Sequence, residues 1–151
     1  MNCENALTVY DDEIQAFCAN TWCKSTTNNT TTCACPLFNG PGLAPVSSKI
    51  KYSDDPNVIV STYDIEQGSR EGRPTMCFGK YVDCYGRPCT ALESEQDKVT
   101  CHCKIKEGPF LTASQNCGPD KNGYLPNGAP VEHGKSGLFA SANDILKLMQ
   151  N

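Results

Sequence analysis

The chain of 151 residues lacks the features that identify most membrane proteins and nucleic-acid-binding proteins. No apolar run approaches the roughly 18 residues that a helix needs to cross a bilayer. Basic residues are not in excess, because 13 Lys and Arg stand against 17 Asp and Glu and the net charge is -4. A nucleic-acid partner requires a basic surface that this composition does not supply. We therefore expect no membrane-spanning helix and no nucleic-acid partner.

Catalytic motifs are also missing. The chain has no G-x-S-x-G, no H-E-x-x-H and no phosphate-binding loop. Its two histidines are His102, on the outer face of an expected strand, and His133, in a Gly/Pro-rich segment. Neither has the nucleophile and acid that a hydrolytic triad needs beside it. We expect no enzyme, no catalytic residue and no cofactor.

Ordinary hydrophobic residues are few, and cysteines are many. Hydrophobic residues make up 38% of the chain even with its 11 cysteines counted among them. Such a chain can bury only a modest core, and covalent cross-links are the usual way to stabilise a small fold of this kind. The composition predicts a cysteine-rich protein held together by its cysteines.

A four-cysteine pattern occurs twice. The two copies are Cys18-x4-Cys23-x9-Cys33-x-Cys35 and Cys84-x4-Cys89-x11-Cys101-x-Cys103. The match continues beyond each C-x-C, where Gly40-Pro41 and Leu43 correspond to Gly108-Pro109 and Leu111. An internal repeat of this kind indicates two homologous units. We predict a first unit over 1–67 and a second over 68–151, packed as one pseudo-symmetric body, with the polar loop 66–74 at the boundary.

The cysteines could form disulfides or bind metal. Zinc hooks usually have two to four residues between paired cysteines, so C-x-C suits zinc poorly, and no histidine lies at a ligand spacing. Three further cysteines lie outside the two patterns, which favours accumulated disulfides. We predict no metal ligand and assign the following residues to disulfides: Cys18, Cys23, Cys33, Cys35, Cys77, Cys84, Cys89, Cys101, Cys103 and Cys117.

The alternation of residues around the second C-x-C suggests how these cysteines pair. In a strand, residues i and i+2 share a face, so Cys101 and Cys103 would point inward from a strand over 99–105. Four cysteines allow three pairings, and we expect each C-x4-C to join its own C-x-C. Cys77 and Cys117 would close around the second unit.

Because eleven is odd, at least one cysteine has no intramolecular partner. Cys3 is the candidate. It would be a free thiol, a dimerising thiol or a lipid-anchored residue, and only the last would bring the protein to a membrane. The remaining alternative is that Cys3 is paired and another cysteine is free.

Local patterns predict a small, disulfide-rich α+β fold that leans towards β structure, with two four-cysteine repeats plus a C-terminal helix. Ser141 is a suitable N-cap for that helix, and an apolar stripe follows it at 145–149. We expect Trp22 in the core. The other expected elements are a short helix over 11–18, strands over 58–63 and 75–81, and turns at 40–42 and 108–109 that end each unit's strand.

The stretch from Cys84 to Cys103, with Cys-x-Gly-x-Pro-Cys followed by C-x-C, resembles a pattern in uncharacterised exported or envelope proteins of Gram-negative bacteria. In those proteins the second motif is often Cys-x-Cys-Pro, as in 33–36 here. The resemblance covers about a third of the chain and implies a bacterial, secreted or periplasmic protein. It carries no activity and no functional residues. The first unit departs from it, because the Gly and Pro are missing between Cys18 and Cys23.

Three functions fit these observations. The first is a non-enzymatic binding or structural module in an oxidising compartment, extracellular or periplasmic, whose protein or envelope partner would meet the loops 66–74 and 118–137. The second is a secreted inhibitor of a hydrolase, since the segment from Cys117 to Asn127 is similar to part of the Kazal inhibitor motif but lacks its next cysteine. The third is a thiol-redox or zinc-binding protein that uses the C-x-C pairs.

Overall fold

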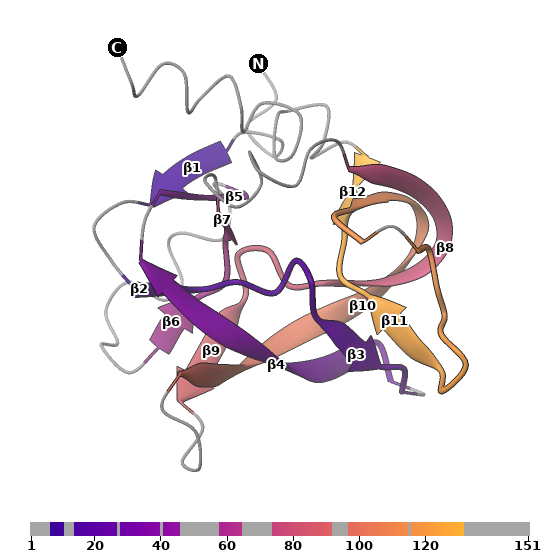
Figure 1. Ribbon diagram of the computed structural model, residues 1–151, viewed down its shortest axis with the longest axis horizontal. Coiled ribbons are helices and arrows are strands. Elements are labelled where there is room, and N and C mark those ends of the chain that lie inside the picture. The colour runs from indigo at the N-terminus through magenta and orange to yellow at the C-terminus, as the bar shows by residue number, and fades with distance from the viewer. Residues whose placement is uncertain are drawn as a thin grey trace.

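The computed structural model describes residues 7–10, 14–26, 28–39, 41–45, 58–64, 74–91, 97–114 and 116–131. Every named element in these ranges is a β-strand. The strands form one seven-stranded sheet, one three-stranded sheet and one two-stranded sheet. Figure 1 shows that they curve into a nearly closed body. Over the ranges given above, no helix has the length and apolar character to span a bilayer.

The strands, in chain order, are β1 (Leu7–Tyr10), β2 (Ile14–Ala16), β3 (Trp22–Lys24), β4 (Thr30–Asn39), β5 (Gly42–Pro45), β6 (Val58–Val60), β7 (Tyr63–Asp64), β8 (Thr75–Asp83), β9 (Pro88–Ala91), β10 (Lys98–Thr112), β11 (Tyr124–Pro126) and β12 (Ala129–Pro130). β10, with 15 residues, organises the large sheet. Its first half pairs with β4 and β9, and its second half pairs with β8 and β12.

The two C-x-C motifs lie on β4 and β10 and face the interior. Both strands alternate buried and exposed residues there, as expected for strands with one buried face. The strand predicted over 99–105 is therefore found, and His102 is exposed as expected. β4 runs antiparallel to β10 with Cys33 directly opposite Cys101. The two halves of the chain thus contribute neighbouring strands to one sheet.

The main core contains eight cysteines together with a few aliphatic side chains, among them Val82, Val99 and Leu125. A second cluster joins Cys77 to Tyr81 and Phe110, whose rings stack with centroids 4.4 Å apart. Disulfide sulfur fills the volume that branched aliphatic residues fill in an ordinary domain. The low hydrophobic content of the chain is therefore compatible with a packed interior.

The predicted α+β class is wrong, because the described elements are all strands. The helix expected over 11–18 is replaced in part by β2, which pairs with β4 and buries Gln15 and Ala16 completely. The apolar spacing in this segment suits a helix, but pairing with β4 overrides that local preference. The C-terminal helix expected after Ser141 lies outside the described residues.

The turn expected at Gly108-Pro109 is also wrong, because both residues lie inside β10. Gly108 is directly opposite Gly79 of β8, and the two glycines have φ of 140° and 136°. Only glycine adopts such angles readily, so both strands can bend at the same point without breaking their pairing. Figure 1 shows that β8 is strongly curved.

The remaining sequence-based expectations have mixed outcomes. The strand predicted over 75–81 is β8, whereas the strand predicted over 58–63 is divided into β6 and β7. Residues 65–73 are outside the described ranges, so the boundary between 1–67 and 68–151 stays a prediction.

A partly buried ion pair, with a buried carboxylate and a half-exposed lysine, connects β8 to β10 and provides a test of the fold. The Asp83 side chain is only 7% exposed, and its Oδ2 lies 2.8 Å from Lys106 Nζ. Its other oxygen accepts the backbone N–H of Tyr85 at 3.1 Å. We expect Lys106→Met to lower the free energy of unfolding by about 1–2 kcal/mol in urea denaturation, because the carboxylate then stays buried without its cation.

Lys104→Met is the matched control, because Lys104 is on the same strand and exposed. Its effect should stay within about 0.5 kcal/mol, as for most surface substitutions. Equal losses for the two variants would show that the ion pair contributes nothing specific.

Candidate functional site

The ten cysteines assigned to disulfides form five disulfides, and each C-x4-C is joined to its own C-x-C. The bonds are Cys18–Cys35, Cys23–Cys33, Cys84–Cys103, Cys89–Cys101 and Cys77–Cys117. In both units the outer two cysteines pair and the inner two pair. Cys3 lies outside the described residues.

The nested pairing in the second unit follows from the registers of β8 and β9 on β10. β8 ends with Asp83 opposite Lys104, and β9 places Cys89 opposite Cys101. Between these two points the segment that links β8 to β9 has five residues, 84–88, whereas the facing part of β10 has only two, 102 and 103. The extra residues loop out, and the two disulfides close the loop at either end.

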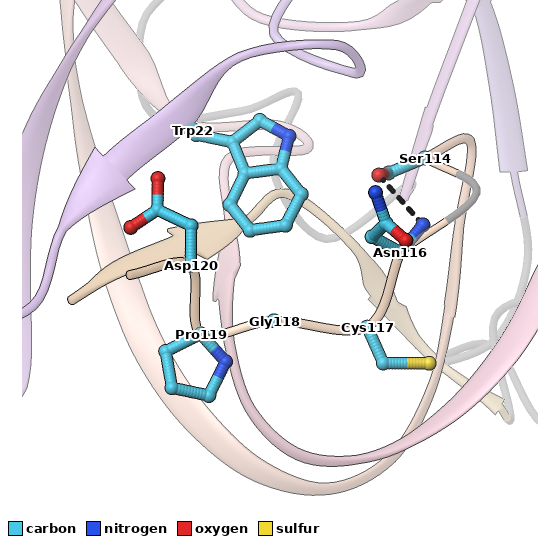
Figure 2. Close-up of a pocket in the computed structure, with 7 residues that line it drawn as sticks. All are labelled: Trp22, Ser114, Asn116, Cys117, Gly118, Pro119 and Asp120. Atoms are coloured by element: carbon cyan, nitrogen blue, oxygen red, sulfur yellow. Dashed lines mark hydrogen bonds between the residues drawn. The ribbon is translucent and has the colours of Figure 1, made fainter. Parts of the chain in front are cut away.

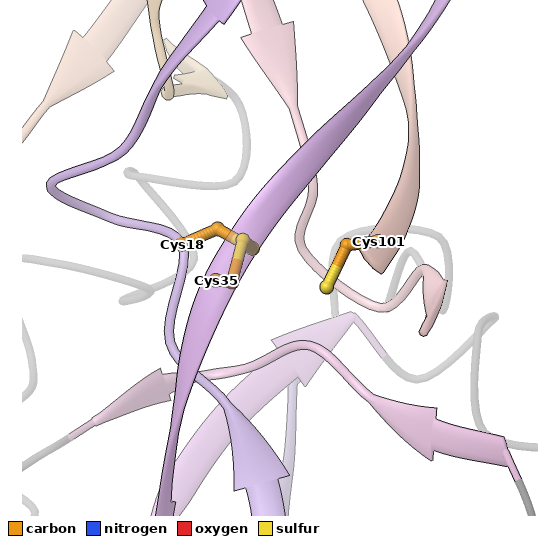
Figure 3. Close-up of side chains that lie close together, drawn as sticks. All are labelled: Cys18, Cys35 and Cys101. Carbon is orange, nitrogen blue, oxygen red and sulfur yellow. A yellow bond between two sulfur atoms is a disulfide. The ribbon is translucent and has the colours of Figure 1, made fainter. Parts of the chain in front are cut away.

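The disulfides of the two units contact each other in the core. The sulfurs of Cys18, Cys35 and Cys101 all lie within 4.8 Å of one another (Figure 3). A second contact between the two units joins Cys84 Sγ to Cys33 Sγ, which are 3.6 Å apart. Three thiolates at these distances could hold zinc, but these sulfurs are bonded in disulfides. The arrangement is a packed core of sulfur.

An open surface pocket of about 580 Å³ lies where the loop after β10 meets β3 (Figure 2). We call it the Trp22 pocket, and its lining residues are Trp22, Ser114, Asn116, Cys117, Gly118, Pro119 and Asp120. The expectation that Trp22 belongs to the core is only half right, because its side chain is half-buried and lines the pocket. The pocket combines one aromatic ring, one carboxylate and neutral polar groups.

Hydrogen bonds within the loop hold the Asp120 carboxylate. Its Oδ1 accepts the backbone N–H groups of Asn122 at 2.8 Å and Tyr124 at 2.9 Å. The backbone N–H of Asp120 donates to the carbonyl of Tyr124, also at 2.9 Å. Residues 120–124 thus form a hydrogen-bonded turn, which fixes the position of the negative charge of Asp120 at the pocket.

Gly118 allows the loop to approach Trp22 closely. Its φ is +65°, and a Cβ at this position would lie 2.9 Å from Trp22 Cζ3 and 2.8 Å from Pro126 Cδ. A side chain would therefore clash with both residues, and glycine is the residue that fits. The loop backbone packs against the indole ring as a result.

The sequence indicates only part of this site. The segment 118–137 was expected to face a partner, and its first three residues line the pocket, whereas 66–73 and 132–137 lie outside the described residues. Trp22, Ser114 and Asn116 were missed as site residues. The antiparallel pairing of β3 with β11, with Trp22 opposite Pro126, brings Trp22 to the loop. No motif in the sequence signals that pairing.

A second exposed feature lies on the ribbon of β8 and β10. Met76 is 61% exposed and Phe78 is 78% exposed. Their partners across the ribbon are Leu111 and Pro109, so four apolar residues share this face. Cys77, between Met76 and Phe78, points to the opposite face and is buried.

Comparisons with known proteins identify no protein similar to this chain. No protein-family model, no curated protein and no solved structure matches the chain. What the Trp22 pocket does is therefore inferred from its own residues and geometry.

Proposed function

We propose that this protein is a non-enzymatic, exported binding module whose Trp22 pocket takes up a basic side chain from a partner protein. The observation that carries the proposal is the presence of one aromatic ring and one fixed carboxylate in the same open pocket. Binding residues are commonly placed on loops that a rigid scaffold holds in position, and here the scaffold is cross-linked by disulfides.

The disulfides support the exported location. Five disulfides in one small protein are typical of an oxidising compartment, because cytosolic thiols are kept reduced. We place the protein in the periplasm or outside the cell of a bacterium, in line with the resemblance of its cysteine pattern. We also propose that the two units arose by duplication, since both have the same nested pairing.

The chemistry of the pocket favours a cation. Asp120 is the one charged group among the residues lining the pocket, and Trp22 lines the pocket beside it. A guanidinium group can stack on an indole face while it donates hydrogen bonds to a carboxylate. The net charge of -4 on the chain also favours a basic partner over an acidic one.

The geometry supports the two alternatives less well. An inhibitor of a protease presents an extended, substrate-like segment, whereas the turn at 120–124 closes on itself through four hydrogen bonds. Thiol-redox chemistry or zinc binding at the C-x-C pairs needs accessible thiolates. Cys33, Cys35, Cys101 and Cys103 are at most 3% exposed and are bonded in disulfides.

We expect a hexa-arginine peptide to change the fluorescence of Trp22, the single tryptophan of the chain, in a saturable way. Asp120→Asn keeps the acceptor oxygen for Asn122 and Tyr124 but removes the charge, so it should weaken the binding roughly two- to fivefold. The titration is made at low ionic strength, where surface charges are screened least.

A hexa-glutamate peptide is the matched ligand control and should produce no saturable change. Asp97→Asn, which removes an exposed carboxylate outside the pocket, is the matched protein control. Equal responses to the two peptides, or equal weakening by the two variants, would refute the proposed pocket.

A further inference from the structure

The five disulfides differ sharply in their exposure to solvent. The eight cysteines of the two four-cysteine units are each at most 3% exposed. Cys117 is exposed and lines the Trp22 pocket, whereas its partner Cys77 is 3% exposed. Among the ten disulfide-bonded cysteines, Cys117 is therefore the one that an incoming reagent can reach.

Only one end of the Cys77–Cys117 bond is exposed, because side chains packed around Cys77 cover the other end. Cys77 packs in a buried cluster with Tyr81 and Phe110 and lies opposite Phe110 in the pairing of β8 with β10. A nucleophile must approach a disulfide sulfur along the line of the bond, so access to each sulfur decides which one is attacked. Here Cys117 is the exposed end of the bond, so the approach leads to Cys117 and not to Cys77.

We propose that Cys77–Cys117 is an exchangeable disulfide and that Cys117 is its site of attack by external thiols. The thiolate of a small thiol, or of a cysteine on a partner protein, forms a bond to Cys117 Sγ. The Cys77–Cys117 bond breaks, its electron pair leaves on Cys77 Sγ, and that sulfur takes a proton from solvent. The product is a mixed disulfide on Cys117 and a buried thiol at Cys77, which can attack Cys117 again and expel the thiol.

The fold can tolerate this step. β8 stays paired with β10 over nine residue pairs after the bond opens. The loop that holds Cys117 is fixed at its ends, since β10 precedes it and β11 pairs with β3 after it. The freed part is the wall of the pocket, where the backbone of Gly118 packs against the ring of Trp22. Exchange therefore changes the shape of the pocket and leaves the main core of eight cysteines intact.

Exposure of the oxidised protein to reduced glutathione tests the proposal, in a Cys3→Ser background that removes the eleventh cysteine. Trapped thiols are alkylated and located by peptide mass spectrometry. We expect one glutathione adduct on Cys117, one alkylated thiol at Cys77 and eight cysteines that remain in disulfides. The fluorescence of Trp22 should change with the same time course as the adduct.

An adduct on Cys77, or modification of the core cysteines at a comparable rate, would overturn the proposal. So would the absence of any adduct at glutathione concentrations that reduce the whole protein. The double variant Cys77→Ser/Cys117→Ser should form no adduct and should retain its other four disulfides, which separates exchange at this bond from general reduction.

Two single variants measure the asymmetry directly. Cys77→Ser leaves a thiol at Cys117, and Cys117→Ser leaves a thiol at Cys77. Under native conditions the Cys117 thiol should react with an aromatic disulfide reagent about tenfold faster or more, because reactivity follows access. Equal rates would contradict the one-sided exposure. This inference does not depend on the binding of a basic ligand, since the hexa-arginine titration can fail while the adduct still forms on Cys117.

Discussion

Replacement of Cys84 and Cys103 by alanine is expected to lower the free energy of unfolding by about 4–5 kcal/mol. A closed loop of 19 residues contributes about 3 kcal/mol through the entropy of the unfolded chain, and the nested Cys89–Cys101 bond shortens the path and lowers this to about 2–3 kcal/mol. The rest comes from the cavity left by two sulfurs that are completely or almost completely buried, because a well-packed core collapses only in part around a deletion. Since small domains are stable by only about 5–15 kcal/mol, this loss approaches the total.

Replacement of Cys77 and Cys117 by alanine is the matched control. The two cysteines of this disulfide are 40 residues apart in the sequence, against 19 for Cys84 and Cys103. However, the Cys84–Cys103 bond shortens the path between its ends, and only one of its two cysteines, Cys77, is buried, so the cavity left is smaller. We therefore expect a smaller loss, about 3 kcal/mol, in guanidinium denaturation of both variants. If the control lost as much as the core variant, chain entropy alone would explain the disulfides and the sulfur core would have no packing role.

Gly42→Ala is expected to lower the free energy of unfolding by about 3 kcal/mol. A Cβ on Gly42 would overlap Gln15 Oε1 and Thr62 Oγ1. These two atoms are joined by a hydrogen bond of 2.6 Å, and both residues are completely buried. The added methyl must separate them, so the cost combines overpacking with the loss of a buried hydrogen bond.

Gly123→Ala distinguishes this steric cost from the conformational cost of replacing any glycine. Gly123 has φ of +83° and open space around the position of a Cβ. Its replacement should cost only about 1 kcal/mol, the usual penalty for a left-handed residue with a side chain. Urea denaturation of both variants measures the difference. Equal losses would mean that the Gln15–Thr62 contact adapts to the extra methyl.

Much of the disulfide core could be predicted from sequence, because its signals are local. Alternation places Cys101 and Cys103 on one face of a strand, and the second copy has the same C-x4-C and C-x-C spacings as the first. The prediction that each C-x4-C joins its own C-x-C needs only short-range geometry. The sequence leaves the order of pairing within each unit open. In the second unit this order depends on the loop between β8 and β9.

The errors arose where a distant strand decides the local conformation. The residues around Ile14 have an apolar spacing that suits a helix, but β4 offers them a pairing partner and they form β2. Gly108-Pro109 is a common turn dipeptide, but the facing Gly79 lets both strands bend together instead. In each case the partner lies far away in the chain, so a local pattern carries no information about it.

Composition and residue spacing are sufficient to show that this is a cysteine-rich chain with too few aliphatic residues for an ordinary core, and that its C-x-C pairs face inward from strands. Those properties follow from composition and from the two-residue period of a strand. Two features depend on contacts between distant parts of the chain. The two units meet with Cys33 opposite Cys101, and the pairing of β3 with β11 brings Trp22 to the loop that carries Asp120 and Cys117. The reason is physical: strand pairing depends on hydrogen bonds between backbones, which are almost identical for every residue, so the choice of partner is made by packing across the whole fold.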